Sequence, residues 1–429
     1  MTNTSSVKPA RAIGLLGLTA IAVNSMVGAG IFALPANVAL LLGPASLLGY
    51  AVTAVCVLLV VACFAEAGSM FETSGGPYVY AKEALGPFIG FQAGWMLVLS
   101  RVSGGAAIAN TFASYLAYLW PSAAGGSGRV LALSLMMGVL TWVNYRGVRP
   151  GVWMIQALTV GKMIPLLVFC FVGLFYVDVH QFTWTALPQA ASLQQATLLL
   201  VFAFGGFEYA SVPSEEVIDP RRTLPRALMT AVIAVVILYL WIQFVAMGTL
   251  PGIATSTTPL TSAAQKFMGP AGALLLTIGA LFSTSGTNSA AIFVGPRTLY
   301  SMARAGQLPA WMGALHPRYQ TPGAATLLFA LVTWGFAVTG SFTVLATVAA
   351  LARVFYYTTT CLAVPILRRR MPNSSGFRLP GGWLIPALAL GICGWLVAGT
   401  SRANAISAGT AFVVGCVVYG VQQWTRRAR

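Results

Sequence analysis

The chain has 429 residues, of which 58% are hydrophobic and only 7% are charged, and its formal net charge is +16 at pH 7. So few charged residues cannot cover the surface of a water-soluble protein of this length, which excludes a soluble enzyme. The basic residues are spread between apolar runs rather than clustered on one soluble face, so we expect no nucleic-acid partner.

Long apolar runs recur along the whole chain, each close to the roughly 20 residues that cross a bilayer as a helix. They predict an all-α integral membrane protein with about twelve transmembrane helices. The polar start, residues 1–11, has no signal-peptide cleavage pattern, and we expect it to remain as a tail. The expected spans are 12–34, 43–66, 88–119, 129–145, 151–176, 193–217, 225–249, 270–303, 323–340, 343–367, 382–400 and 404–424.

The basic residues are divided unevenly between the two sides of this topology. One side holds far more of them than the other, which is the positive-inside pattern, and it places both termini, 1–11 and 425–429, in the cytoplasm of a cell-membrane protein. Membrane lipids are therefore expected partners, while the sequence leaves open a monomer or a homodimer. The richer side carries Lys8, Arg11, Arg146, Arg149, Arg221, Arg222, Arg226, Arg318, Arg368, Arg369, Arg370, Arg378, Arg426, Arg427 and Arg429, and the poorer side carries Arg129, Lys266 and Arg402.

The sequence indicates no metal site and no cofactor. All six cysteines fall within expected helices and form no CxxC pair, which is typical of packing residues. The two histidines, His180 and His316, fall in loops on opposite sides of the membrane. No nucleophile–base pair or phosphate-binding loop occurs at membrane depth, so we do not expect an enzyme.

The first expected helix contains a weak point, Gly28-Ala29-Gly30, followed by Pro35. Glycine costs about 1 kcal/mol against alanine inside a helix, and proline removes a backbone donor. Backbone that leaves the helix at membrane depth is tolerated only inside protein or beside a watery cavity. The break therefore predicts a binding site, and the freed amides of a helix N-terminus favour an anionic group there.

The sixth expected helix has a second weak point at Gly205-Gly206, with Glu208 beside it and Pro213 behind it. Five helices separate the two breaks, so the second set of five enters the membrane from the opposite side. We expect inverted repeats over 12–176 and 193–367, followed by two further helices over 382–424. Paired interruptions of this kind point to the midplane site of a transporter, although close helix packing also uses glycine.

Four motifs carry a resemblance to a known family. They are Gly28-Ala29-Gly30-Ile31-Phe32, Glu66–Phe71 with Gly75–Tyr80, Glu215-Glu216 with Asp219–Arg226, and Arg297–Arg304 with Gly306 and Pro309. Together they resemble the amino acid–polyamine–organocation (APC) transporters, from about residue 12 to 370. The resemblance implies the LeuT-type fold, in which a mobile bundle of helices 1, 2, 6 and 7 moves against a scaffold of helices 3, 4, 8 and 9.

The two breaks offer opposite partial charges to an amino acid. Amides of Ala29, Gly30 and Ile31 are placed to receive a carboxylate, and carbonyls of Phe202, Ala203 and Gly205 an ammonium, without burying formal ions. The resemblance supports the same division. The resemblance also implies that Phe202 covers the substrate as an aromatic gate, with ordinary packing as the alternative. It further implies that Gly105 and Ala291 face the side chain of the substrate.

Lys162 lies near the middle of the fifth expected helix, where a lysine is costly and usually functional. The resemblance places its ammonium at the sodium position of sodium-coupled relatives, near the Val27 carbonyl and the groups of Ser283 and Thr287. This argues against sodium coupling. Two roles stay open for Lys162: a proton-exchanging group or a permanent structural tie.

Two further charges have several possible roles. Glu208 is either a proton carrier or cation-attracting group, or an acid that caps the amides freed at the second break. Arg101 departs from the family pattern, and it either pairs with Glu208, contacts the cytoplasmic vestibule, binds a substrate carboxylate or snorkels to the cytoplasmic face. Gating pairs or lipid contacts are expected for Arg297 and Arg353 near the cytoplasmic helix ends, with the acids Glu66, Glu72 and Glu83 as candidate partners.

The leading functional hypothesis is a sodium-independent secondary transporter of amino acids that works by alternating access with proton symport. Neutral substrates are favoured, because only Glu208 is available near the midplane for a distal amine. The alternatives are an exchanger or exporter, and a carrier of cationic amino acids or polyamines. A non-transporting amino acid sensor is a distant alternative, since the chain ends within about five residues of its last expected helix.

Overall fold

The computed structural model describes residues 13–71, 75–183, 187–211, 217–372, 374 and 376–427, with the side chains of 148–152 and 427 excepted. Within these residues the regular structure is helical, and the only β pairing is an isolated bridge between Ile13 and Val217. The expectation of an all-α protein is confirmed. Glu72, Pro213, Glu215, Glu216, Lys8 and Arg11, which carry parts of the sequence argument, lie outside the described residues.

The helices follow the expected spans closely. Each expected span falls on one helix or on a broken pair, and short 3-10 turns make up much of the remainder. The helices of the expected spans are α1 (Leu15–Met26), α2 (Ala29–Leu42), α3 (Ser46–Ser69), α5 (Pro87–Leu116), α6 (Gly126–Tyr145), α7 (Val148–Gly173), α8 (Ala190–Phe204), α9 (Pro220–Thr249), α10 (Pro259–Arg304), α11 (Gly323–Thr339), α12 (Phe342–Arg370), α13 (Leu384–Ala398) and α14 (Arg402–Arg427).

Seven helical segments in the described chain are long and apolar enough to cross a membrane, and α1, α8, α11 and α13 are shorter apolar helices. Large apolar side chains such as Leu16, Trp153 and Phe175 are exposed on the outside of the bundle. Bare apolar surface of this extent is stable against lipid and not against water, which agrees with a multi-pass membrane protein.

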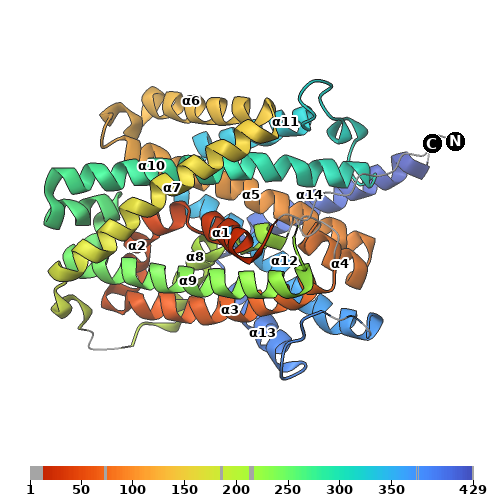
Figure 1. The fold of residues 1–429 in the computed structure, drawn as a ribbon, viewed down its shortest axis with the longest axis horizontal. Helices are drawn as coiled ribbons and strands as arrows, with labels where there is room; N and C mark the ends of the chain where they lie inside the picture. Colours follow the sequence, from red (N-terminus) through yellow and green to blue (C-terminus); the bar gives the residue numbers. More distant parts are fainter. Residues whose placement is uncertain are drawn as a thin grey trace.

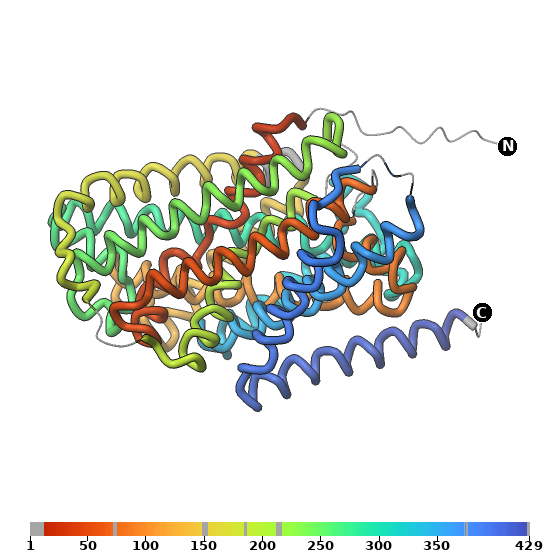
Figure 2. The backbone as a smooth tube through the Cα atoms, turned by 90° about the horizontal axis from the view of Figure 1, so that it is seen from below, coloured from red at the N-terminus to blue at the C-terminus, as the bar shows by residue number. Residues whose placement is uncertain are grey.

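The helices form an elongated bundle. In Figure 1, α3, α9 and α10 run along the long axis, and α7 crosses α10 obliquely. The C-terminal α14 lies along the outside of the bundle in Figure 2, and only 6% of the residues in its most apolar stretch are buried. The interior is built around α5, which packs on both α10 and α12.

Glycine and proline account for the departures from straight helices. α10 turns sharply at Gly269, whose φ of 64° only glycine adopts readily, so the expected span 270–303 is the part beyond this turn. The segment between the second and third expected spans contains a short helix, α4 (Pro77–Leu85). It begins at Pro77, where a missing backbone N–H costs nothing at the start of a helix.

Candidate functional site at two helix breaks

The first break lies where the sequence predicts it. α1 ends at Met26 and α2 begins at Ala29, while Val27 (φ −73°, ψ 84°) and Gly28 (φ −122°, ψ −150°) are not helical. The N-cap Gly28 offers no side chain to the following amides, and no side-chain cap is present. The first N–H groups of a helix have no partner inside it, so the buried start of α2 presents the amides of Ala29, Gly30 and Ile31.

The second break lies at Gly205 and Gly206. α8 ends at Phe204, Gly205 is extended (φ −75°, ψ 156°), and Gly206 has a φ of 120° before a 3-10 turn, η5 (Phe207–Ser211), begins. A Cβ atom on Gly206 would overlap the carbonyl oxygen of Ser25, in the last turn of α1. Glycine is therefore needed here both for its backbone angle and for its lack of a side chain.

The two breaks face each other. A Cβ atom placed on Gly30 would lie 2.6 Å from the Cβ atom of Ala203, so the start of α2 packs directly on the last turn of α8. The amides at the start of α2 and the carbonyls at the end of α8 thus belong to one region. Because helix N-termini are partly positive and C-termini partly negative, this region presents both signs of charge.

Lys162 on α7 lies against the last turn of α1. Its side chain is fully buried, and its Nζ donates hydrogen bonds to the carbonyl oxygens of Val27 (2.6 Å) and Asn24 (2.7 Å). The ammonium thus satisfies carbonyls that the end of α1 leaves without a helical partner. The Asn24 contact was missed from the sequence, because only the tertiary structure shows which turn of α1 faces α7.

Ser283 and Thr287 on α10 reach the same break from the other side. The hydroxyl of Ser283 donates to the Val27 carbonyl at 3.4 Å, so Ser283 and Lys162 share one acceptor. Thr287 donates to the carbonyl of Ser283 at 2.9 Å and lies beside Gly28, rather than bonding to the ammonium. These groups tie α7 and α10 to the point at which the first helix breaks.

Phe202, Gly105 and Ala291 are all buried, and Phe202 lies in the last turn of α8 before the second break. The ring of Phe202 meets Phe342 edge-on, with centroids 5.9 Å apart, and lies beside Gly104. A Cβ atom on Gly105 would lie 3.0 Å from Oδ1 of Asn288 and 3.1 Å from Thr333. The small residue of α5 therefore faces a polar group of α10.

Asn288 is a residue that the sequence reasoning missed. Its side chain is fully buried, and within the described chain neither its Oδ1 nor its Nδ2 makes a hydrogen bond. Buried polar groups are almost always paired, so the amide of Asn288 is open to a partner such as a water molecule or a substrate. The same holds for the amide of Gln243, which is also buried without a hydrogen bond among the described residues. A polar residue inside a spanning segment was the available signal.

Glu208 caps the second break. The backbone N–H of Gly206 donates to its Oε2 at 2.9 Å, and the hydroxyl of Tyr356 donates to its Oε1 at 2.8 Å. Nε of Arg353 lies 3.8 Å from the same Oε1. The carboxylate is buried, and its charge is balanced by a cation and by donated hydrogen bonds, as buried charges require.

The sequence places Arg353 near an end of its helix, and the structure corrects this. Arg353 lies within α12, is 7% exposed, and its Nη1 donates to the carbonyl oxygen of Phe202 at 2.6 Å. A more distant contact of 3.4 Å joins Nη1 to the carbonyl of Val201. A Cβ atom on Gly205 would overlap this guanidinium. Helix geometry places residue 353 within α12, but only packing shows that it turns toward α8.

Arg101 on α5 is also buried, at 4% exposure, so it does not snorkel to the cytoplasmic face. Its Nη1 donates to Thr298 at 2.8 Å, and its guanidinium carbon lies 4.6 Å from the ring centre of Tyr209. Within the described chain, its Nε and Nη2 donate no hydrogen bond. The ion pair with Glu208 that the sequence allowed is absent from the described contacts, since Glu208 pairs with Arg353.

Of the other candidate gate residues, Glu66 has a clear partner. Its carboxylate accepts two hydrogen bonds from Arg368, at 2.5 and 2.6 Å, and a third from the backbone of Leu379. Arg297 instead donates to the carbonyl of Phe293 and stacks over its ring. Glu83 meets Arg370 through its backbone carbonyl alone among the described contacts.

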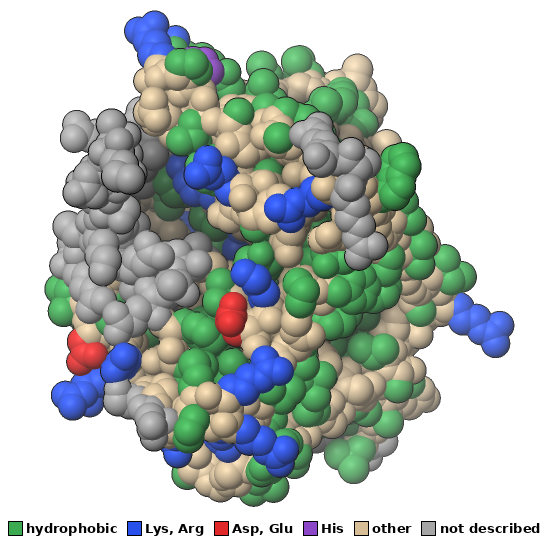
Figure 3. Space-filling model, turned by 90° about the vertical axis from the view of Figure 1, so that its right-hand side faces the viewer, with side chains coloured by type: hydrophobic (Ala, Val, Ile, Leu, Met, Phe, Trp, Pro, Cys, Tyr) green, Lys and Arg blue, Asp and Glu red, His purple; other side chains and the backbone are tan. Residues whose placement is uncertain are grey.

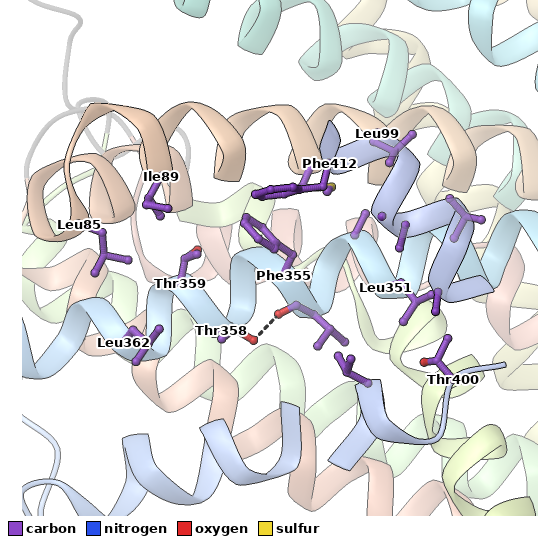
Figure 4. A pocket seen from close by; sticks show the side chains of 18 residues that line it. Leu85, Ile89, Leu99, Leu351, Phe355, Thr358, Thr359, Leu362, Thr400 and Phe412 are labelled. Atoms are coloured by element: carbon purple, nitrogen blue, oxygen red, sulfur yellow. Dashed lines mark hydrogen bonds between the residues drawn. The ribbon is translucent and has the colours of Figure 1, made fainter. Parts of the chain in front are cut away.

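A cleft of about 620 Å³ lies elsewhere, between α5, α12 and α14 (Figure 4). Leu85, Ile89, Leu99, Phe355 and Phe412 line it, together with other apolar side chains and a few threonines. No ionisable side chain is among the described residues of its lining. Its chemistry suits hydrocarbon, and it does not contain the residues of the two breaks.

Comparison with known proteins identifies the family. The sequence model of the amino acid permeases matches residues 13–422. The chain belongs to this amino acid permease family, within the APC superfamily. The resemblance inferred from the motifs is thus confirmed, and the chain is a transport protein rather than an enzyme.

Individual relatives differ in what they carry. The chain is 27% identical to the methylthioribose transporter of Bacillus subtilis, over 96% of this chain and 93% of that protein. It is 31% identical to an uncharacterised transporter of Mycobacterium tuberculosis, over 98% and 93% of the two chains. It is 25% identical to the branched-chain amino acid permease of Bacillus subtilis, over 95% and 92%.

Proposed function

We propose that this amino acid permease is a sodium-independent secondary transporter that binds the carboxylate of its substrate at the break in the first helix. The observation that carries the proposal is the free N-terminus of α2, which lies against the broken end of α8 while Lys162 holds the Val27 carbonyl behind it. Amides at a helix N-terminus bind carboxylates without any buried counter-ion.

The helix contacts support alternating access by a LeuT-type fold. α1, α3, α8 and α9 pack on one another, as do α5, α6, α10 and α11. We infer that the first set is the mobile bundle and the second the scaffold that the sequence resemblance implies. We infer that 12–176 and 193–367 are the inverted repeats, with the breaks of α1/α2 and α8/η5 in matching positions, and that 382–424 adds two further helices.

The partners of Lys162 support sodium independence. The ammonium takes two backbone carbonyls and shares one of them with Ser283, so oxygen atoms suited to Na⁺ already face a fixed cation. A second cation there would meet strong repulsion in a medium of low dielectric constant. Proton symport is our leading mechanism, and obligate exchange and export remain its alternatives.

The distribution of charge supports an orientation in the membrane. Figure 3 views the end of the molecule at which α4 lies, and Lys and Arg side chains are spread over it with few acidic ones. α10 and α12 each carry basic residues in their last turn, at Arg304 and Arg368–Arg370. We propose that this end faces the cytoplasm of a cell-membrane protein, with both termini on the same side.

The test is uptake by the purified protein in proteoliposomes. Labelled amino acids with neutral, cationic and acidic side chains are offered with and without Na⁺, and with and without an inward proton gradient. We expect uptake that is unchanged by Na⁺ and raised by the proton gradient. Counterflow without net uptake would show an exchanger, and transport that requires Na⁺ would overturn the assignment of Lys162.

A sensor that binds a ligand without moving it is the remaining alternative class. Binding measured by a shift in the unfolding temperature, without uptake or counterflow of the same compound, would support it over transport.

A further inference from the structure

Arg353 bonds to one of the carbonyls at the end of α8 that the sequence analysis assigned to a substrate ammonium. Its Nη1 lies 2.6 Å from the carbonyl oxygen of Phe202, and its guanidinium carbon lies 5.5 Å from the centre of the Phe202 ring. Gly205 leaves the space for this guanidinium, since any Cβ atom there would overlap it. The second break is therefore shaped around an arginine of the protein itself.

A second carbonyl of the same turn also has a donor. The hydroxyl of Tyr239 on α9 lies 2.7 Å from the carbonyl oxygen of Met26 and 3.2 Å from that of Ala203. An ammonium bound here would also stand beside a guanidinium. Two charges of the same sign that lie this close together repel strongly in the low-dielectric interior of a protein.

The charges around the breaks are unbalanced. Among the described side chains buried there, Arg101, Lys162 and Arg353 are cations and Glu208 is the one acid. Glu66 is also buried, but it is paired with Arg368 near the ends of α3 and α12. Buried charge without compensation is costly, so this excess favours a substrate that brings negative charge.

Neutral polar contacts are available as well. Asn288 is fully buried with both amide atoms unbonded, opposite Gly105, and Arg101 has two nitrogens without acceptors in the described chain. An amide both donates and accepts, so it suits an oxygen-bearing group such as a hydroxyl or an oxo oxygen.

We propose that the site takes a small organic carboxylate that lacks an α-ammonium group, such as a 2-oxo or 2-hydroxy acid. This inference rests on the proposed transport function and narrows its substrate class. The carboxylate binds at the N-terminus of α2, and Arg353 supplies the positive charge that an amino acid would bring itself. Moved together with one proton, such an anion crosses the membrane without net charge.

The test compares compounds that differ only at the α carbon. Proteoliposomes are offered L-leucine, its 2-oxo analogue and its 2-hydroxy analogue, each labelled, and then the corresponding set built on alanine. Counterflow against unlabelled compound is measured, and protein-free liposomes correct for the acids that cross lipid unaided. We expect the 2-oxo or 2-hydroxy acid to be carried at least about tenfold faster than the amino acid, a difference of about 1.4 kcal/mol.

The outcomes separate this inference from the proposed function. Equal or faster counterflow of the amino acid would overturn the inference, since Arg353 would then have to yield to an ammonium, while the transport function would stand. Absence of counterflow for all these carboxylates would overturn both.

A variant tests the role of the guanidinium directly. Arg353→Gln combined with Glu208→Gln removes the pair without leaving a buried acid unpaired, and it should move the preference toward the amino acid by about tenfold or more. The exposed Arg402→Gln on α14 is the matched control and should leave the preference unchanged. If the double variant carries the compounds in the wild-type ratio, Arg353 does not select against the ammonium. Should it fail to fold, the wild-type comparison decides.

Discussion

The ammonium of Lys162 lies 2.6 Å from the carbonyl oxygen of Val27, the residue at which the first spanning helix breaks. This bond joins α7 to the broken end of α1, and a second bond to Asn24 holds the same turn. In the proposed alternating-access mechanism α1 moves, and the buried ammonium of Lys162 ties it to α7. Transport requires that this tie be released or carried along.

Lys162→Met should abolish proton-driven uptake while leaving counterflow measurable. Methionine keeps much of the volume of the side chain but neither its charge nor its donors, so the Val27 carbonyl loses its partner. We expect net uptake to fall by about tenfold or more if the proton passes through Lys162. Initial rates in proteoliposomes with and without a proton gradient measure the difference.

The exposed Lys266→Met is the control for this substitution and should leave both rates unchanged. Equal loss of net uptake and counterflow in Lys162→Met would instead identify Lys162 as a structural tie.

Gly206→Ala should destabilise the protein strongly. The φ of 120° is unfavourable for alanine, and its Cβ atom would overlap the Ser25 carbonyl. Backbone strain alone costs about 1–3 kcal/mol, and the overlap adds to it. The matched control is Gly391→Ala on α13, which has no neighbouring atom within 4 Å and no positive φ. Thermal unfolding in detergent should show a lower midpoint for Gly206→Ala alone; matching midpoints would contradict the geometry of the break.

Arg368→Met should destabilise the ends of α3 and α12. Glu66 is fully buried, and Arg368 is its ion-pair partner, so the substitution leaves an uncompensated charge. Breaking a buried pair costs about 3–5 kcal/mol, whereas an exposed pair contributes about 0–1 kcal/mol. The control is therefore Arg222→Met, which breaks the exposed pair with Asp219.

The free energy of unfolding measures both variants. Adding Glu66→Gln to Arg368→Met should recover part of the loss, because the neutral amide needs no counter-ion. No recovery would mean that Arg368 acts through packing rather than through the charge of Glu66.

Gly105→Ala should discriminate between substrates by size. The new Cβ atom would lie 3.0 Å from Oδ1 of Asn288 and 3.1 Å from Thr333, so it narrows the space between α5 and α10. We expect the KM for a leucine-sized substrate to rise by about tenfold and the KM for an alanine-sized one to change little. Gly138→Ala on α6, with no atom within 4 Å, is the control. A uniform change for all substrates would remove Gly105 from the side-chain region.

The sequence predicted most of the helices because their signal is local. A run of apolar residues must be helical in lipid, since no water is present to bond its backbone. The breaks were equally visible, because glycine and proline weaken a helix wherever they occur. The contact of Lys162 with Val27 followed from the rarity of a charge at that depth together with the family resemblance.

The sequence by itself determined the class of protein, the helix positions and the two interruptions, all of which depend on neighbouring residues in the chain. Only the tertiary structure decided which side chains fill those interruptions. Arg353 and Phe202 are far apart in the chain and touch because α12 packs on α8, and Asn288 has unbonded amide atoms only because of what surrounds it. The direction of a side chain and the identity of its partners are properties of packing, and no local pattern encodes them.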